Sequence, residues 1–155
     1  MKRIIKIIKD RTKYDEDKIA EIYEILFNHF YSNPGSLSQN EKNFFYINNL
    51  SMEVNNGGFD QFFLNPSGNY TIETLQALEL IGENNTAKLL KEAMAEFPRS
   101  EIPRNRDDRI DILEKISQKS QEKWDKLDKQ FYACEHNISD LLISFVTKNI
   151  NDFNH

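Results

Sequence analysis

The chain has 155 residues, 39% of them hydrophobic and 29% charged, which is the composition of an ordinary globular domain. Its five glycines and four prolines are too few for an all-β protein, and the lack of any run of about 18 apolar residues excludes a membrane-spanning helix. Residues 1–13 carry net +5, residues 14–96 net −9 and residues 97–155 net −1, and this acidic body excludes direct nucleic-acid binding because it repels phosphate.

The first elements in chain order are two predicted helices. Residues 1–13 place four isoleucines on one side of a helical wheel, which favours a short amphipathic helix, with a β-strand as the alternative. Residues 15–31 repeat apolar residues at spacings of three and four. Three acidic residues crowd the first turn of this second helix, where the helix dipole favours carboxylates, and an Asn-Pro-Gly turn at residues 33–35 ends it.

A third helix is predicted to begin after Ser38. Ser38 and Glu41 have the spacing of a capping box, in which each side chain accepts a hydrogen bond from the backbone N–H of the other. The helix should end near the Asn-Asn-Gly sequence at residues 55–57, because glycine at a helix end accepts a positive φ without a Cβ clash. The three phenylalanines at residues 59–63 then form a short helical turn packed into the core.

Four more helices complete the predicted fold. Thr71 caps a helix that ends at Gly82, and Asn85 caps the next, which ends before a surface loop at residues 98–106. A helix then begins at Asp107, and a last helix covers residues 137–150. The sequence therefore predicts an all-α protein that folds as a single compact domain of about seven helices.

Residues 53–65 read EVNNGGFDQFFLN, a run of amides and glycines beside a dense aromatic group. One interpretation is structural, because carboxylates and amides at a helix end usually cap backbone groups or face water. The alternative is a small hydrolase-like enzyme in which Glu53 and Asp60 serve as acid and base. In that alternative three amides position the substrate: Asn55, Asn56 and Gln61.

Other catalytic and cofactor chemistry has no support in the sequence. The three histidines are scattered over different elements, and no zinc-protease, nucleophile-elbow, P-loop or dinucleotide-binding motif occurs. We therefore predict no catalytic residue, no metal and no cofactor. The apolar run at the N-terminus is interrupted by Lys6 and Lys9, unlike a signal peptide, and the lone Cys134 fits a reducing compartment, so a cytoplasmic location is expected.

Residues 53–65 resemble the signature of a bacterial family of uncharacterised domains that is similar to the DNA-mimic protein family. That signature is E-x-N-N-G-G-F-x-Q-[YF]-F-x-N, followed by a Ser-Gly turn, found here at residues 67–68, and by a helix ending in Ile-Gly, found here at residues 81–82. A later W/F-x-x-L-D-x-x-F-Y helix is matched by Trp124, Leu127, Asp128, Phe131 and Tyr132. The candidate binding residues in the signature are Glu53, Asn55, Asn56, Gly57, Gly58, Phe59, Asp60 and Gln61.

The resemblance covers residues 41–153. It implies an all-helical, DNA-mimic-protein-like domain over this range, with residues 1–40 as a helical extension packed on the same domain. It also implies a non-enzymatic role in protein interaction, because the best-characterised relative uses an acidic surface to occupy the DNA site of a transcription factor. The partner implied is a basic or DNA-binding protein.

A candidate acidic face lies on the predicted helix at residues 15–31. Asp17, Glu21 and Glu24 recur at spacings of four and three, which stacks them on one face, opposite the apolar residues of the same helix. A run of charges on a helix is usually only a solvated face. The functional interpretation is an acidic surface offered to a basic, nucleic-acid-binding protein.

Overall fold

Six α-helices make up most of the part of the chain that the structure describes: α1 (Arg3–Lys9), α2 (Asp15–Ser32), α3 (Gln39–Leu64), α4 (Thr71–Ile81), α5 (Asn84–Met94) and α6 (Arg106–Lys148). Short 3-10 turns lie at Pro34–Ser36, Pro66–Tyr70, Pro98–Ser100 and Ile150–Asp152. The computed structural model describes residues 2–155, apart from the side chains of residues 135 and 136, and this part contains no strand. Because a kink divides α3 into two segments, the described part has seven helical segments, and the all-α prediction is confirmed.

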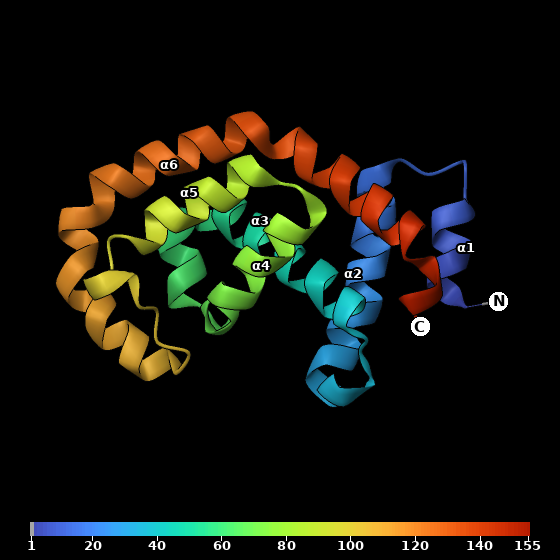
Figure 1. Ribbon diagram of the computed structural model, residues 1–155, viewed down its shortest axis with the longest axis horizontal. Coiled ribbons are helices and arrows are strands. Elements are labelled where there is room, and N and C mark those ends of the chain that lie inside the picture. Colours follow the sequence, from blue (N-terminus) through green and yellow to red (C-terminus); the bar gives the residue numbers. More distant parts are fainter. Residues whose placement is uncertain (1) are drawn as a thin grey trace.

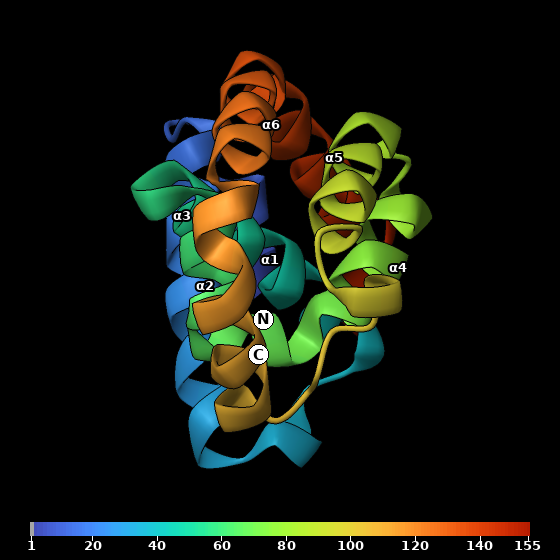
Figure 2. The same ribbon diagram turned by 90° about the vertical axis from the view of Figure 1, so that its left-hand side faces the viewer.

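The longest helix, α6, has 43 residues and arches over the others (Figure 1). Long helices curve in this way around a core, with the convex side toward solvent. α3 is the central helix and contacts α2, α4 and α6. α4 and α5 lie on one side of the molecule and α2 lies on the other (Figure 2). This arrangement leaves one long side of α2 facing solvent.

Buried apolar side chains from all six helices form one continuous core, so the fold is a compact all-α domain. α1 packs against α2 and α6, with Ile4 and Ile7 buried, which confirms the helix and not the strand for this segment. The backbone N–H of Ile4 donates to the carbonyl oxygen of His155 at 3.0 Å, so the two labelled ends of the chain lie side by side (Figure 1). The division of the chain at residue 40 stays a prediction.

The capping box at the start of α3 is confirmed. The Ser38 hydroxyl accepts from the N–H of Glu41 at 3.1 Å, and Glu41 Oε2 accepts from the N–H of Ser38 at 2.8 Å. Glu41 is fully buried, and its Oε1 accepts from the N–H of Asn154 at 2.6 Å. The cap of α3 therefore also anchors the C-terminal segment.

Two predicted helix caps are wrong. Thr71 is the first residue of α4, and its hydroxyl donates to the carbonyl of Gly68 at 2.8 Å instead of capping the helix. Glu83, not Asn85, caps α5, since its carboxylate accepts from the N–H of Thr86 at 3.1 Å. The buried Glu83, two residues earlier, takes the role that the sequence pattern assigned to Asn85, and Asn85 lies exposed.

The break predicted before residue 137 is also wrong, because α6 is continuous from residue 106 to residue 148. Phe131 and Ile138, on either side of the predicted break, are both buried. These residues are seven apart, which is about two helical turns, so both lie on the buried face of one helix. No glycine or proline lies between them to end it.

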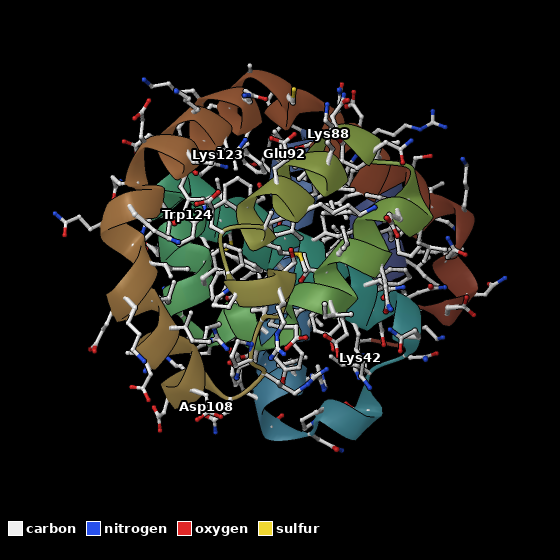
Figure 3. All side chains as sticks on the ribbon, turned by 60° about the vertical axis from the view of Figure 1, so that its left-hand side comes forward. Lys42, Lys88, Glu92, Asp108, Lys123 and Trp124 are labelled. Carbon is white, nitrogen blue, oxygen red and sulfur yellow. The ribbon has the colours of Figure 1, made fainter. Side chains whose placement is uncertain are left out.

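A hydrogen bond and an ion pair connect α5 to α6. Trp124 points inward from α6 and donates its indole N–H to the carbonyl of Ala93 at 3.2 Å. Lys123, beside it, donates to Glu92 at 2.9 Å, with Lys88 close by (Figure 3). The Lys123 ammonium lowers the pKa of the Glu92 carboxyl. Both contacts fix the part of α6 that approaches the kink in α3.

Candidate functional site

The glycine pair of the NNGG sequence kinks α3 between a segment at residues 39–56 and a segment at residues 59–64. Gly57 has φ −156° and ψ 20°, and Gly58 has φ 76° and ψ −177°. The combination at Gly58 is a backbone region that only glycine adopts readily. The helix therefore breaks where the sequence predicted, but the chain continues at once into a second helical segment.

A carboxylate from α6 occupies the space that a side chain on Gly58 would fill. Asp128 Oδ1 accepts from the N–H of Phe59 at 2.9 Å, and a Cβ on Gly58 would lie 2.2 Å from Asp128 Oδ2. The first N–H groups of a helical segment have no partner within it, so Asp128 caps residues 59–64 from another helix. Burial raises the pKa of the Asp128 carboxyl, and the bond from Phe59 opposes that shift.

The three phenylalanines after the kink are buried, as predicted, and each of Phe59, Phe62 and Phe63 is 0% exposed. The ring of Phe59 meets Phe131 edge-on, with 6.2 Å between centroids, and Phe63 lies 5.7 Å from Trp124. The two stretches of sequence that carry the family resemblance, far apart in the chain, thus pack against each other.

The Glu53 carboxylate joins the chain before the kink to the chain after it. Its Oε2 accepts from the side-chain amides of Gln61 and Asn65, both at 2.8 Å, and its Oε1 accepts from the Ser67 hydroxyl at 3.0 Å. The Asn56 amide donates to the oxygen of the same Gln61 side chain at 3.2 Å. One hydrogen-bond network around the kink therefore joins Glu53, Asn56, Gln61, Asn65 and Ser67.

Two further candidate residues, Asn55 and Asp60, contact serine side chains. Asn55 is exposed and contacts the Ser51 hydroxyl at 3.4 Å. Asp60 is half-buried and accepts from the Ser117 hydroxyl of α6 at 3.2 Å.

A shallow groove of about 470 Å³ lies between α2 and α3 beside Glu53. The described residues that line it are Tyr23, Asn49, Met52, Glu53, Asn55, Asn56 and Gln61. Asp60 does not line this groove. The structure therefore does not bring Glu53 and Asp60 together in one cleft, which is the arrangement that the hydrolase alternative requires.

Sequence reasoning missed Arg109, a fully buried cation at the end of α3. Its Nε donates to the carbonyl of Phe63 at 2.5 Å, and its Nη2 donates to the carbonyl of Asn65 at 3.0 Å and to Asn69 Oδ1 at 2.8 Å. The dipole of a helix favours a positive charge at its C-terminal end. A Cβ on Gly68 would lie 2.8 Å from Arg109 Nε, so the glycine of the Ser-Gly turn makes room for this side chain.

One sequence signal could have identified Arg109. Arg109 precedes the buried residues Leu113 and Ile116 by four and seven positions, so it lies on the core face of α6. A charged residue on a core face is rarely fully buried without polar partners. The apolar pattern instead suggested Ile110, which is only half-buried.

The acidic residues proposed for α2 lie on its solvent-facing side. Asp17 and Glu24 are exposed, and no hydrogen bond or ion pair engages them within the described residues. Glu21 is ion-paired with Lys13 at 2.5 Å, and that bond raises the pKa of Lys13. The basic segment before α2 therefore neutralises one of the three carboxylates.

Neither a metal site nor a membrane span is found in the described part of the chain. No group of three or more His, Cys, Asp or Glu side chains there is placed to hold a metal ion. No helix in the same part combines the length and the apolar character needed to cross a bilayer. Cys134 is a half-buried free thiol.

Comparison with known proteins agrees with the resemblance seen in the sequence. The model of the DMP19-like protein family matches residues 35–149, from the turn before α3 to the end of α6. No curated protein and no solved structure matches the chain. The family match includes the kink, the turn at residues 67–68 and the part of α6 that contacts them. Because it spans well over half of the sequence, the chain belongs to the DMP19-like protein family.

Proposed function

We propose that the chain is a non-enzymatic protein-interaction domain that offers the acidic face of α2 to a basic, DNA-binding protein. The observation that carries this proposal is the exposure of Asp17 and Glu24, two carboxylates that form no hydrogen bond or ion pair within the described residues, although Lys13 lies near enough for the charge of Asp17 to raise its pKa. Family membership supports the proposal, since the resemblance to the DNA-mimic protein family implies an interaction of this kind. α2 precedes the residues that the family model matches, so the evidence for its acidic face comes from this chain's own sequence and not from the family match.

The charge on α2 limits what this surface can imitate. A helix of 18 residues is about 27 Å long, and B-DNA of that length carries about 16 negative charges. α2 carries five carboxylates, and two of them, Asp15 and Glu21, are paired with Lys18 and Lys13. We therefore propose that the partner is recognised through a few ion pairs, and not through complete replacement of a DNA duplex.

The signature residues have a separate role in this proposal. Glu53 accepts three hydrogen bonds from its own chain, and Asp128 caps the segment after the kink. These contacts support a structural role for the NNGG sequence. No observation favours an acid and base pair at this position.

Reversing the charge of the acidic face should slow binding without unfolding the protein. In a D17K/E21K/E24K variant we expect the association rate with a partner captured from the native cytoplasm to fall by about tenfold or more at low salt. The difference from wild type should shrink at about 1 M salt, where the Debye length is about 3 Å. Surface plasmon resonance at several salt concentrations measures both effects.

The matched control changes three exposed carboxylates of α6 to lysine, Asp111, Glu114 and Asp125, which alters the net charge by the same amount. This control should bind nearly as fast as wild type. Circular dichroism and urea unfolding verify that both variants are folded. Equal association rates for the α2 variant and wild type at every salt concentration would refute the proposal.

A further inference from the structure

A row of one half-buried and two exposed aromatic rings runs along α2 beside its acidic face. Tyr23, Phe27 and Tyr31 are four residues apart, so their rings lie on successive turns of one face, tilted against each other with centroids 5.8 Å and 4.8 Å apart. Phe27 is 43% exposed and Tyr31 is 60% exposed. An exposed apolar patch bordered by polar residues is typical of a binding surface.

The row continues from Tyr23 onto α3. Met52, which is 50% exposed, lines two adjoining grooves between α2 and α3, and Tyr23 lines both of them as well. We call Met52, Tyr23, Phe27 and Tyr31 the α2–α3 stripe. Aromatic residues and methionine are enriched in protein interfaces, where a few such side chains contribute most of the binding free energy.

The α2–α3 stripe is held in place from beneath by the core. The ring of Tyr23 stacks on Phe45 at 5.3 Å, and Phe27 contacts the same ring at 6.4 Å. Phe45 is 1% exposed. The Tyr23 hydroxyl also donates to Asn49 Oδ1 at 2.7 Å. Rings fixed in this way lose little conformational entropy when a partner binds.

Carboxylates border the stripe on both helices. Glu24 precedes Phe27 by three residues on the exposed side of α2, Glu16 lines one groove and Glu53 lines the other. The single lysine of α2, Lys18, is paired with Asp15 at 3.1 Å. The surface is thus complementary to a cationic partner. A second copy of the chain would bring these carboxylates against one another, which opposes self-association.

We infer that the α2–α3 stripe docks an arginine-bearing segment of the partner, with guanidinium groups lying over Phe27 and Tyr31 and pairing with Glu24. This inference rests on the proposed function, because it concerns the same basic partner, and it adds selection for arginine over lysine. The planar guanidinium stacks on aromatic faces and pairs with a carboxylate through two hydrogen bonds, whereas the ammonium of lysine is a compact, strongly hydrated charge.

Two short synthetic peptides test this inference. They carry equal numbers of cationic residues separated by serines, arginine in one and lysine in the other. We expect wild-type protein at low salt to bind the arginine peptide about fivefold more tightly or better, since each stacked guanidinium at an exposed site adds a modest attraction. NMR titration gives both dissociation constants and identifies the residues whose signals shift.

An F27L/Y31L variant removes the aromatic faces and keeps apolar bulk, so the fold should persist. The preference for arginine should disappear in this variant, with affinity for the lysine peptide unchanged. The control is Tyr14→Ala, which removes an exposed tyrosine outside the stripe and should leave the preference intact.

Three results would overturn the inference. If wild type binds both peptides equally and D17K/E21K/E24K binds neither, charge alone is recognised, and the proposed function survives without the stripe. If wild type binds neither peptide at low salt, both proposals fail. If wild type sediments as a dimer and F27L/Y31L sediments as a monomer, the stripe is occupied by a second copy of the chain.

Discussion

Replacing Phe59 or Phe62 by alanine is expected to lower the free energy of unfolding by about 3–5 kcal/mol in each case. Both rings are 0% exposed, and Phe59 packs against Phe131 of α6. Removing either ring leaves a cavity in the core, and such cavities collapse only partly because neighbouring helices are already close-packed. Urea titrations followed by circular dichroism measure the change, provided that the m-value stays constant.

Leu64→Ala is the matched control, because Leu64 belongs to the same helical segment and is 40% exposed. The Leu64→Ala variant should lose about 1.5 kcal/mol or less of the free energy of unfolding, because the Leu64 side chain is only partly removed from water in the folded protein. If Phe59→Ala is as stable as Leu64→Ala, the helical segment after the kink does not pack into the core.

Gly58→Ala is expected to destabilise the protein by about 2–5 kcal/mol. A side chain at φ 76° and ψ −177° strains the backbone, which costs about 1–3 kcal/mol. The new Cβ would also displace the Asp128 carboxylate from the N–H of Phe59, leaving a buried donor without its acceptor. Thermal and urea unfolding of the variant measure the total effect.

Gly82→Ala separates the two contributions. Gly82 has φ 81°, and a Cβ there would meet nothing within 4 Å, so only backbone strain of about 1–2 kcal/mol is expected. Gly58→Ala should also be less harmful in an Asp128→Ala background, where the displaced carboxylate is absent. Equal losses for Gly58→Ala and Gly82→Ala would show that the contact with Asp128 contributes nothing.

Local structure was predictable where the interacting groups lie within one or two turns of each other. The Ser38 and Glu41 capping box and the helix break at the glycine pair both follow from neighbouring residues. The buried phenylalanines after the break follow from their apolar spacing. The acidic residues of α2 were placed on one solvent-facing side by the same kind of spacing.

Contacts between distant parts of the chain were not predictable from spacing. Asp128 and Phe59 are 69 residues apart, and Arg109 and Phe63 are 46 residues apart. The pair between Lys13 and Glu21 depends on how the chain turns between α1 and α2. Such contacts contribute most to the case for a structural role of the glycine pair. Its polar neighbours Glu53, Asn56 and Gln61 bind one another, and the N–H of Phe59 binds the Asp128 carboxylate of α6. The groove beside Glu53 is not lined by Asp60.

If the NNGGF residues serve the fold and not catalysis, Glu53→Gln should lower the free energy of unfolding. Gln61, Asn65 and Ser67 all donate hydrogen bonds to the Glu53 carboxylate. Glutamine keeps the shape of the side chain but replaces one acceptor oxygen by a donor group, so at least one of these bonds is lost. We expect a loss of about 1–2 kcal/mol, because Glu53 is only partly buried and water can replace some of the lost bonding. Urea unfolding of Glu53→Gln beside wild type is the most direct test. A less stable variant agrees with a structural role for the motif, and a variant as stable as wild type, or more stable, would contradict it.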